Sequence, residues 1–324
     1  GNWSADGTSG TANGTIQITA GTALNLDAYG DGSRVIIGNG GSKFVSGNEI
    51  LTNSSATGNI TVHAGNVSLI AQDNSSFAQA RIGNRGLTTA GGNIDVEATA
   101  ANATFAITAY GTNLASIGNG IGLNTGSSSG NITVSSAGTL AITAIDSGQA
   151  RIAGGFTANS NISVTANGTV SLTVSGTPGT YQSGGPAPGQ ALIGNFGNGL
   201  SGLVGGNISI TSTHGNITLL SDEDGGFVSI GNLGGATTTT GNVLVSALNG
   251  TVSIAANGGV ASSFDNGANA MLSYASIAEI GNSTSTGNVT GNIIVNAKQL
   301  TIDASGESAV ATLGHLGDNA AGSQ

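Results

Sequence analysis

The stretch Gly58–Asn84, GNITVHAGNVSLIAQDNSSFAQARIGN, contains three short strand-like runs and decides the fold. Apolar and polar residues alternate in Ile60–Val62 and in Val67–Leu69, and the third run, Ala80–Ile82, ends at a Gly-Asn pair. Alternation with a period of two, bounded by Gly and Asn, is typical of half-buried β-strands. A single triplet of this kind would form only a marginal sheet, so its repetition along the chain matters most.

The triplet occurs eight times, and we treat residues 1–324 as one repetitive segment. The gaps between equivalent first-run residues vary from 30 (Ile132 to Ile162) to 50 (Val243 to Ile293). The eight repeat units are predicted to begin near Thr15, Asn59, Asn93, Asn131, Asn161, Asn207, Asn242 and Asn292. Repeats of this length are typical of folds that stack one unit on the next.

Each run places its aliphatic residues at alternate positions, as Ile60, Val62 and then the small Ala64 illustrate. Like strands in successive units should pair in parallel, which predicts a three-sided parallel β-helix of about eight three-stranded coils. Ile60, Ile94 and Ile132 should then lie in vertical succession. The middle residue of the third run varies freely, which predicts a solvent-facing column made of Ile36, Arg81, Ser116, Arg151, Leu192, Ser229, Glu279 and Thr312.

Two columns of asparagine accompany the strands and are predicted to form structural ladders. The first precedes the first run and consists of Asn59, Asn93, Asn131, Asn161, Asn207, Asn242 and Asn292. The second follows the third run and consists of Asn39, Asn84, Asn119, Asn195, Asn232 and Asn282, with Gly154 and His315 departing from it. Stacked at the strand spacing of about 4.8 Å, asparagine side chains can hydrogen-bond along the stack.

The amino-acid composition argues against some classes of function. The 324 residues carry a formal net charge of −10 with only six Lys and Arg, which argues against nucleic-acid binding. Cysteine is absent, which is compatible with secretion. No apolar run reaches the roughly 18 residues of a membrane-spanning helix, and no signal peptide or polar capping segment is recognisable. We therefore expect a segment of a longer protein.

Candidate binding residues lie in the longer insertions and at an acidic corner. Tyr181, Phe264 and Tyr274 fall in two long loops and are candidates for ligand contact. Asp222-Glu223-Asp224 is a weak calcium candidate, although a solvated acidic edge explains it better. His63, His214 and His315 have no metal-ligand spacing and are interpreted as surface residues. No catalytic residue, cofactor site or metal site is otherwise predicted.

The motif GNITVxAGxVxLxA…AxIGN resembles the repeat shaft of filamentous-haemagglutinin-type exoproteins. These are large adhesins that Gram-negative bacteria export by two-partner secretion, and the biofilm-matrix adhesins among them are most similar. The resemblance covers nearly the whole chain. It implies a right-handed β-helix, a secreted, cell-surface or biofilm-matrix location, an outer-membrane secretion partner, and adhesion to extracellular polysaccharide or neighbouring cell surfaces. The family's amino-terminal secretion domain is missing here.

Two alternatives remain open. Parallel β-helices also serve as polysaccharide lyases and hydrolases, which need convergent carboxylates in a cleft. The nearest cluster is Asp95, Glu97 and Arg81, without an evident acid–base pair, so we expect no enzyme activity. An ice-binding or surface-binding solenoid needs a regular threonine array, whereas the outward first-run positions are mixed. A structural shaft of an adhesin is the preferred prediction.

Overall fold

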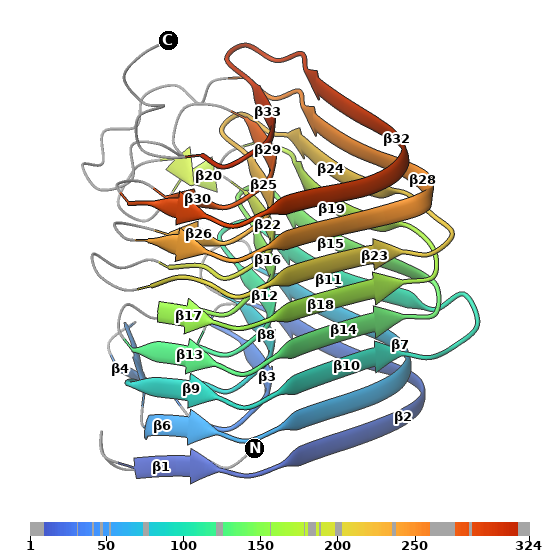
Figure 1. Cartoon of the computed structure of the whole chain (residues 1–324). Helices are drawn as coiled ribbons and strands as arrows, with labels where there is room; N and C mark the ends of the chain where they lie inside the picture. The colour runs from blue at the N-terminus through green and yellow to red at the C-terminus, as the bar shows by residue number, and fades with distance from the viewer. Residues whose placement is uncertain are drawn as a thin grey trace.

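The computed structural model describes residues 10–316 except 31, 41, 46–47, 52, 74–77, 121–125, 156, 178, 181–185, 188, 198–202, 235–237, 260–275 and 285–286. Within this part of the chain all regular structure is β-strand and no residue is helical. Units follow one another from the blue to the red end of the chain, and equivalent strands lie side by side (Figure 1). The expected all-β class is therefore confirmed.

The largest sheet, sheet B, has twelve strands and contains the first and second runs of every unit. Its strands are β2 (Ile16–Tyr29), β7 (Ile60–Gln72), β10 (Ile94–Ala98), β11 (Thr104–Tyr110), β14 (Ile132–Ser136), β15 (Thr139–Ile145), β18 (Ile162–Ala166), β19 (Val170–Ser175), β23 (Ile208–Ser212), β24 (Ile217–Asp222), β28 (Val243–Ala256) and β32 (Ile293–Ala304). All neighbours in this sheet are parallel.

Strand pairing in sheet B closes on itself and corrects the predicted fold class. From β7 the neighbours run β10-β14-β18-β23-β28-β24-β19-β15-β11 and return to β7, so ten parallel strands form a closed barrel. The ring closes because β7 and β28 each continue through the corner between the first and second runs. The first part of each strand pairs with a first-run strand, and its second part pairs with a second-run strand. Instead of a right-handed β-helix with three separate sheets, the pairings define a closed parallel barrel with two further parallel sheets.

Those further sheets are sheet C, which holds the third runs, and sheet A. Sheet C contains β3 (Arg34–Ile37), β8 (Gln79–Ile82), β12 (Leu114–Ile117), β16 (Gln149–Ile152), β22 (Gln190–Ile193), β25 (Phe227–Ile230), β29 (Ile277–Ile280) and β33 (Val310–Leu313). Sheet A contains β1 (Gly10–Asn13), β6 (Asn53–Thr57), β9 (Thr89–Gly91), β13 (Ser127–Ser129) and β17 (Thr157–Asn159). Sheet A was not predicted, because its runs are only three to five residues long and rich in Ser, Thr and Ala.

Four two-stranded pairs complete the described strands. The antiparallel pairs are β4 (Ser42–Val45) with β5 (Asn48–Leu51), and β20 (Gly179–Thr180) with β21 (Pro186–Ala187). The parallel pairs are β26 (Leu233–Gly234) with β30 (Ser283–Thr284), and β27 (Thr239–Thr240) with β31 (Val289–Thr290). The antiparallel pairs lie between β3 and β6 and between β19 and β22, outside the three main sheets.

The predicted register of the repeats is confirmed. Ile60 pairs with Ile94, and Ile94 pairs with Ile132, so the three side chains lie on adjacent strands at equivalent positions. The second and third runs keep register in the same way, as Ile107 with Ile142 and Ile117 with Ile152 show. Because strand side chains alternate between faces, a slip of one residue would turn a whole column outward. A buried aliphatic face therefore fixes the pairing.

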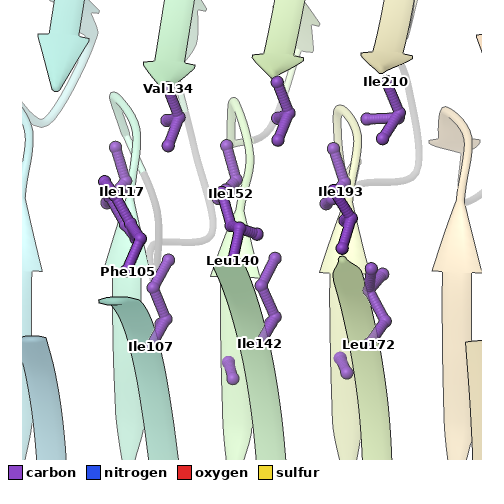
Figure 2. Close-up of a cluster of buried hydrophobic side chains, with 14 of the residues drawn as sticks. Phe105, Ile107, Ile117, Val134, Leu140, Ile142, Ile152, Leu172, Ile193 and Ile210 are labelled. Carbon is purple, nitrogen blue, oxygen red and sulfur yellow. The ribbon is translucent and has the colours of Figure 1, made fainter. Parts of the chain in front are cut away.

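The core contains the inward-facing apolar columns of all three runs, and most of these side chains are fully buried. Figure 2 shows three neighbouring units, in which Ile117, Ile152 and Ile193 face the interior beside Phe105 and Leu140. Complete burial of a Val, Leu, Ile or Phe side chain contributes about 1.5–3 kcal/mol. Each unit gains this energy only where a neighbour covers its columns, so stability is shared between units.

The outward column of sheet C is covered, contrary to the solvent-facing prediction. From Arg81 to Glu279 the six interior members of that column are at most 6% exposed, whereas Ile36 at one end is 39% exposed. A second apolar cluster lies in the same region and consists of Leu114, Ala153, Leu192, Phe227, Leu233 and Ile277, with Phe196 packed against it. The variability of this column therefore reflects a second, more polar interior, which hydrophobic alternation alone does not reveal.

Candidate functional site

The most regular polar arrangement in the protein is the asparagine column that follows sheet C, named here the inner ladder: Asn39, Asn84, Asn119, Asn195, Asn232 and Asn282, each at most 1% exposed. The backbone N–H of one rung donates to the side-chain Oδ1 of the rung in the next unit. This bond measures 3.0 Å from Asn84 to Asn119 and from Asn232 to Asn282. The predicted ladder is thus confirmed, with backbone-to-side-chain bonds as its main connection.

Inner-ladder side chains also bind the chain that enters the first run of sheet B. In Asn232 the Nδ2 group donates to the carbonyl oxygens of Gly206 at 2.8 Å and Thr240 at 2.9 Å. Asn84 makes the equivalent bonds to Gly58 and Gly91 at 2.7 and 2.6 Å. Each rung therefore joins the end of sheet C, the entry to sheet B and the neighbouring unit. Without the amide, these buried carbonyl groups would lose their donors, which is costly.

The two departures from the inner ladder have different consequences. At Gly154 there is no side chain, and in the adjoining unit Asn195 Oδ1 is buried without a hydrogen-bond partner. An added Cβ at Gly154 would lie 2.5 Å from that oxygen. At the other departure, the Asn282 N–H donates to His315 Nδ1 at 3.2 Å, and His315 Nε2 lies 3.0 Å from the Gly291 carbonyl. Since a carbonyl only accepts, the neutral Nε2–H form of imidazole replaces the amide.

The asparagine column before the first run, named here the outer ladder, is exposed and runs in the opposite direction. The Asn93 N–H donates to Asn59 Oδ1 at 3.0 Å, and the Asn292 N–H donates to Asn242 Oδ1 at 2.9 Å. The Asn131, Asn207 and Asn242 N–H groups make the same kind of bond, to Asn93, Asn161 and Asn207. Asn161 and Asn131 are joined by their side chains at 3.3 Å. Because water competes at this surface, the outer ladder contributes less stability than the inner one.

Sheet C buries charged residues on its covered face. Glu279 is 1% exposed and accepts hydrogen bonds from the hydroxyls of Ser229 at 2.9 Å and Ser283 at 3.3 Å. Burial raises the pKa of Glu279 to about 7, and the two serine hydrogen bonds oppose that rise. Arg151, two units before Ser229 along the column, stacks on the Phe196 ring at 4.7 Å and binds Gln190. No sequence signal distinguished these buried charges from surface charges.

Carboxylates of the acidic corner accept hydrogen bonds from backbone amides. Glu223 is 1% exposed and accepts the Gly189 N–H at 3.0 Å, and a backbone hydrogen bond from Ser147 also favours its charged form. Burial raises the pKa of Glu223 to about 7; Asp146 and Asp224 raise it further, and the backbone donors oppose this. Asp224 accepts the Gly259 N–H at 2.6 Å. Two of the three calcium candidates, Asp222, Glu223 and Asp224, thus bind backbone amides.

The remaining candidates do not form a shared site in the described chain. Tyr181, Phe264 and Tyr274 lie outside the described residues. His63 and Glu97 lie 3.9 Å apart on the exposed face of sheet B, next to Asp95.

Arg81 lies in sheet C, where it is 1% exposed, so it does not join Asp95 and Glu97. His214 bonds to Asn167 at the surface through Nδ1 at 2.7 Å. The nearest catalytic cluster in the sequence is therefore divided between two sheets.

Neither the described residues nor comparisons with known proteins assign a function. Among the described residues no three His, Cys, Asp or Glu side chains form a group that could hold a metal. The same part of the chain contains no helix with the length and apolar character needed to cross a membrane. A scan against protein-family models and searches of curated proteins and solved structures found no match. Functional inference therefore depends on the ladders, the sheets and the resemblance of the repeat motif.

Proposed function

We propose that this chain is the structural shaft of a secreted or cell-surface bacterial adhesin or biofilm-matrix protein. The observation that carries the proposal is the connection between units: each is joined to the next in sheets B and C and, for most units, by the inner ladder. Such a connection resists separation of the units, which is the property a spacer needs. The resemblance of the GNITV repeat to filamentous-haemagglutinin-type shafts supports the same role.

The proposed mechanism is mechanical and involves no catalysis. A pull between the two ends of the stack acts on many backbone hydrogen bonds in parallel, because every unit presents several strands to its neighbour. The buried amides add bonds that water cannot replace until the units separate. Load is therefore distributed over each unit boundary instead of falling on one contact.

Adhesive contacts are assigned to the loops. Extracellular polysaccharide or neighbouring cell surfaces are the proposed partners, with Tyr181, Phe264 and Tyr274 as the contact candidates, and export through an outer-membrane secretion partner follows from the same resemblance. Lyase or hydrolase activity is the less favoured alternative, since Arg81 lies in a different sheet from Asp95 and Glu97. For an ice-binding or surface-binding role, no observation in the described chain adds support.

The test is single-molecule stretching of the 324-residue chain between handles at its two termini. A shaft of stacked units is expected to yield stepwise, one unit of 30–50 residues at a time. Each step should lengthen the chain by about 100–180 Å, from 3.3–3.6 Å per extended residue. Unfolding of the whole chain in a single event at low force would refute the proposal.

A matched pair of variants shows whether the inner ladder holds the units together. Asn232→Ala removes two buried amide bonds to Asn195 and two to backbone carbonyls, and it should lower the force of one step. Asn242→Ala removes the exposed side-chain oxygen that accepts the Asn292 N–H in the outer ladder, and it should change the forces little. In parallel, the chain immobilised on beads should retain bacterial cells or matrix polysaccharide. Release of new reducing ends from glycans would favour the enzyme alternative instead.

A further inference from the structure

One unit in the middle of the stack departs from the repeat at two buried positions. Gly154 stands where the neighbouring units have an inner-ladder asparagine. Ser160, which is 1% exposed, stands at the entry to the first run, where the other units have a glycine: Gly14, Gly58, Gly92, Gly130, Gly206, Gly241 and Gly291. This unit therefore lacks a buried amide and carries a buried hydroxyl instead.

The two departures compensate each other in space. In the other units an inner-ladder amide lies against the entry glycine and leaves no room for a side chain. A Cβ added at Gly241 would lie 2.8 Å from Asn232 Nδ2, and similar close contacts occur at the equivalent glycines. Because Gly154 has no side chain, this space accepts the serine at position 160.

The exchange directs polar atoms of three adjoining units toward one place. Among the described residues Asn195 Oδ1 and Ser160 Oγ have no hydrogen-bond partner, although both atoms are buried. They lie 2.5 and 3.2 Å from the position of a Cβ at Gly154. In the intact ladder the Asn84 N–H donates to Asn119 Oδ1 at 3.0 Å, but Gly154 offers the Asn119 N–H no side-chain acceptor. Buried polar atoms without partners are costly, so this place favours a ligand that supplies the missing bonds.

We propose that one water molecule replaces the missing amide and is bound by the Asn119 N–H, Ser160 Oγ and Asn195 Oδ1. Water accepts from the N–H and donates to the amide oxygen, and the serine hydroxyl can do either. An asparagine side chain has twice as many heavy atoms as serine, so the exchange leaves space beside the hydroxyl. Buried waters occupy polar sites with two to four partners, as here. This inference concerns hydration of the interior and goes beyond the proposed shaft function.

The experiment is a crystal structure of the full chain at a resolution that shows ordered water molecules. One water is expected within about 3.2 Å of the Asn119 nitrogen, Ser160 Oγ and Asn195 Oδ1. The intact rung at Asn232 is the control in the same crystal, because its amide binds the backbone carbonyls directly and should hold no water there. No water at Gly154 would overturn the proposal, as would a direct bond from the Gly154 N–H to Asn195 Oδ1.

A double variant, Gly154→Asn with Ser160→Gly, tests the exchange because it rebuilds the pattern of the other units. The φ of Gly154 lies outside the left-handed region, so its backbone accepts asparagine. The introduced amide should displace the water, and a water that persists in the double variant would overturn the proposal. Gly154→Asn alone places the amide against Ser160 Oγ and should unfold several degrees below the double variant. Equal thermal unfolding of these two variants would also overturn it.

Discussion

Glu279 offers the sharpest test of the covered face of sheet C, through the substitution Glu279→Gln. The carboxyl is 1% exposed and accepts hydrogen bonds from two serine hydroxyls of the described chain, at 2.9 and 3.3 Å. Burial raises its pKa from the ordinary 4.5 to about 7. Glutamine keeps the shape and an acceptor for Ser229 but carries no charge, so it removes the cost of ionising a buried acid.

The direction of the pH effect follows from proton binding. Between pH 4.5 and about 7 the folded protein holds a proton at Glu279 that the unfolded chain has lost, so stability falls as pH rises. The contribution is fully present below pH 4.5 and is lost above about pH 7. A pKa difference of 7 − 4.5, or about 2.5, corresponds to about 3–4 kcal/mol at 1.4 kcal/mol per pKa unit. About 2 kcal/mol of this stabilisation is lost as the pH rises from 5.5 to 8.

The assay is amide hydrogen exchange across β25 and β29, because repetitive folds open locally and a single global free energy is poorly defined for them. Glu279→Gln should slow exchange in these strands at pH 8, after correction for the intrinsic pH dependence of exchange, and flatten its dependence on pH. Glu307→Gln, at an exposed position in the last unit, serves as the control.

Equal pH dependence in Glu279→Gln and the parent chain would refute the reasoning. It would mean that the carboxyl is hydrated or that a donor outside the described residues compensates its charge. Glu223, whose pKa is also raised to about 7, adds a similar trend in the adjoining unit. Measuring exchange strand by strand separates the two contributions.

Two further predictions concern the backbone. Gly83→Ala should prevent folding or cost more than about 3 kcal/mol, because its Cβ would lie 1.9 Å from the Gly118 carbonyl oxygen; Gly21→Ala, with nothing within 4 Å, should be nearly neutral, and thermal unfolding compares the two. His315→Ala should speed hydrogen exchange at the Asn282 amide severalfold at constant pH, because it removes the acceptor of that N–H. His315→Asn, which restores the residue found at the other rungs, should bring exchange back toward the parent rate, and equal exchange in His315→Ala and the parent chain would refute the imidazole's role.

The repeat register was predictable because it depends on local alternation. Ile60, Ile94 and Ile132 occupy equivalent positions in runs of the same pattern, and burial leaves them one possible face. The asparagine ladders were predictable for the same reason, since Gly-Asn recurs at a constant distance from each run. The sequence did not show that the inner rungs are buried and bind the glycine entries to sheet B, because those partners lie 7–41 residues away.

Neither the closure of sheet B nor the burial of the outward column of sheet C could be predicted from local sequence patterns. Whether a corner such as Ala64-Gly65-Asn66 ends a strand or carries it through depends on contacts with neighbouring units, which alternation does not encode. Arg81 and Glu279 occupy positions that side-chain alternation predicts to be exposed, yet each is only 1% exposed. Glu279 accepts a hydrogen bond from Ser229, which lies 50 residues earlier, so its environment depends on contacts between units.

The amino-acid sequence by itself determined which residues pair between units, because side-chain alternation and a buried aliphatic face allow one register. Only the tertiary structure decided how the paired strands close around the core and which polar residues are removed from water. These features arise where segments distant in sequence meet, and the free energy of covering a surface depends on what covers it.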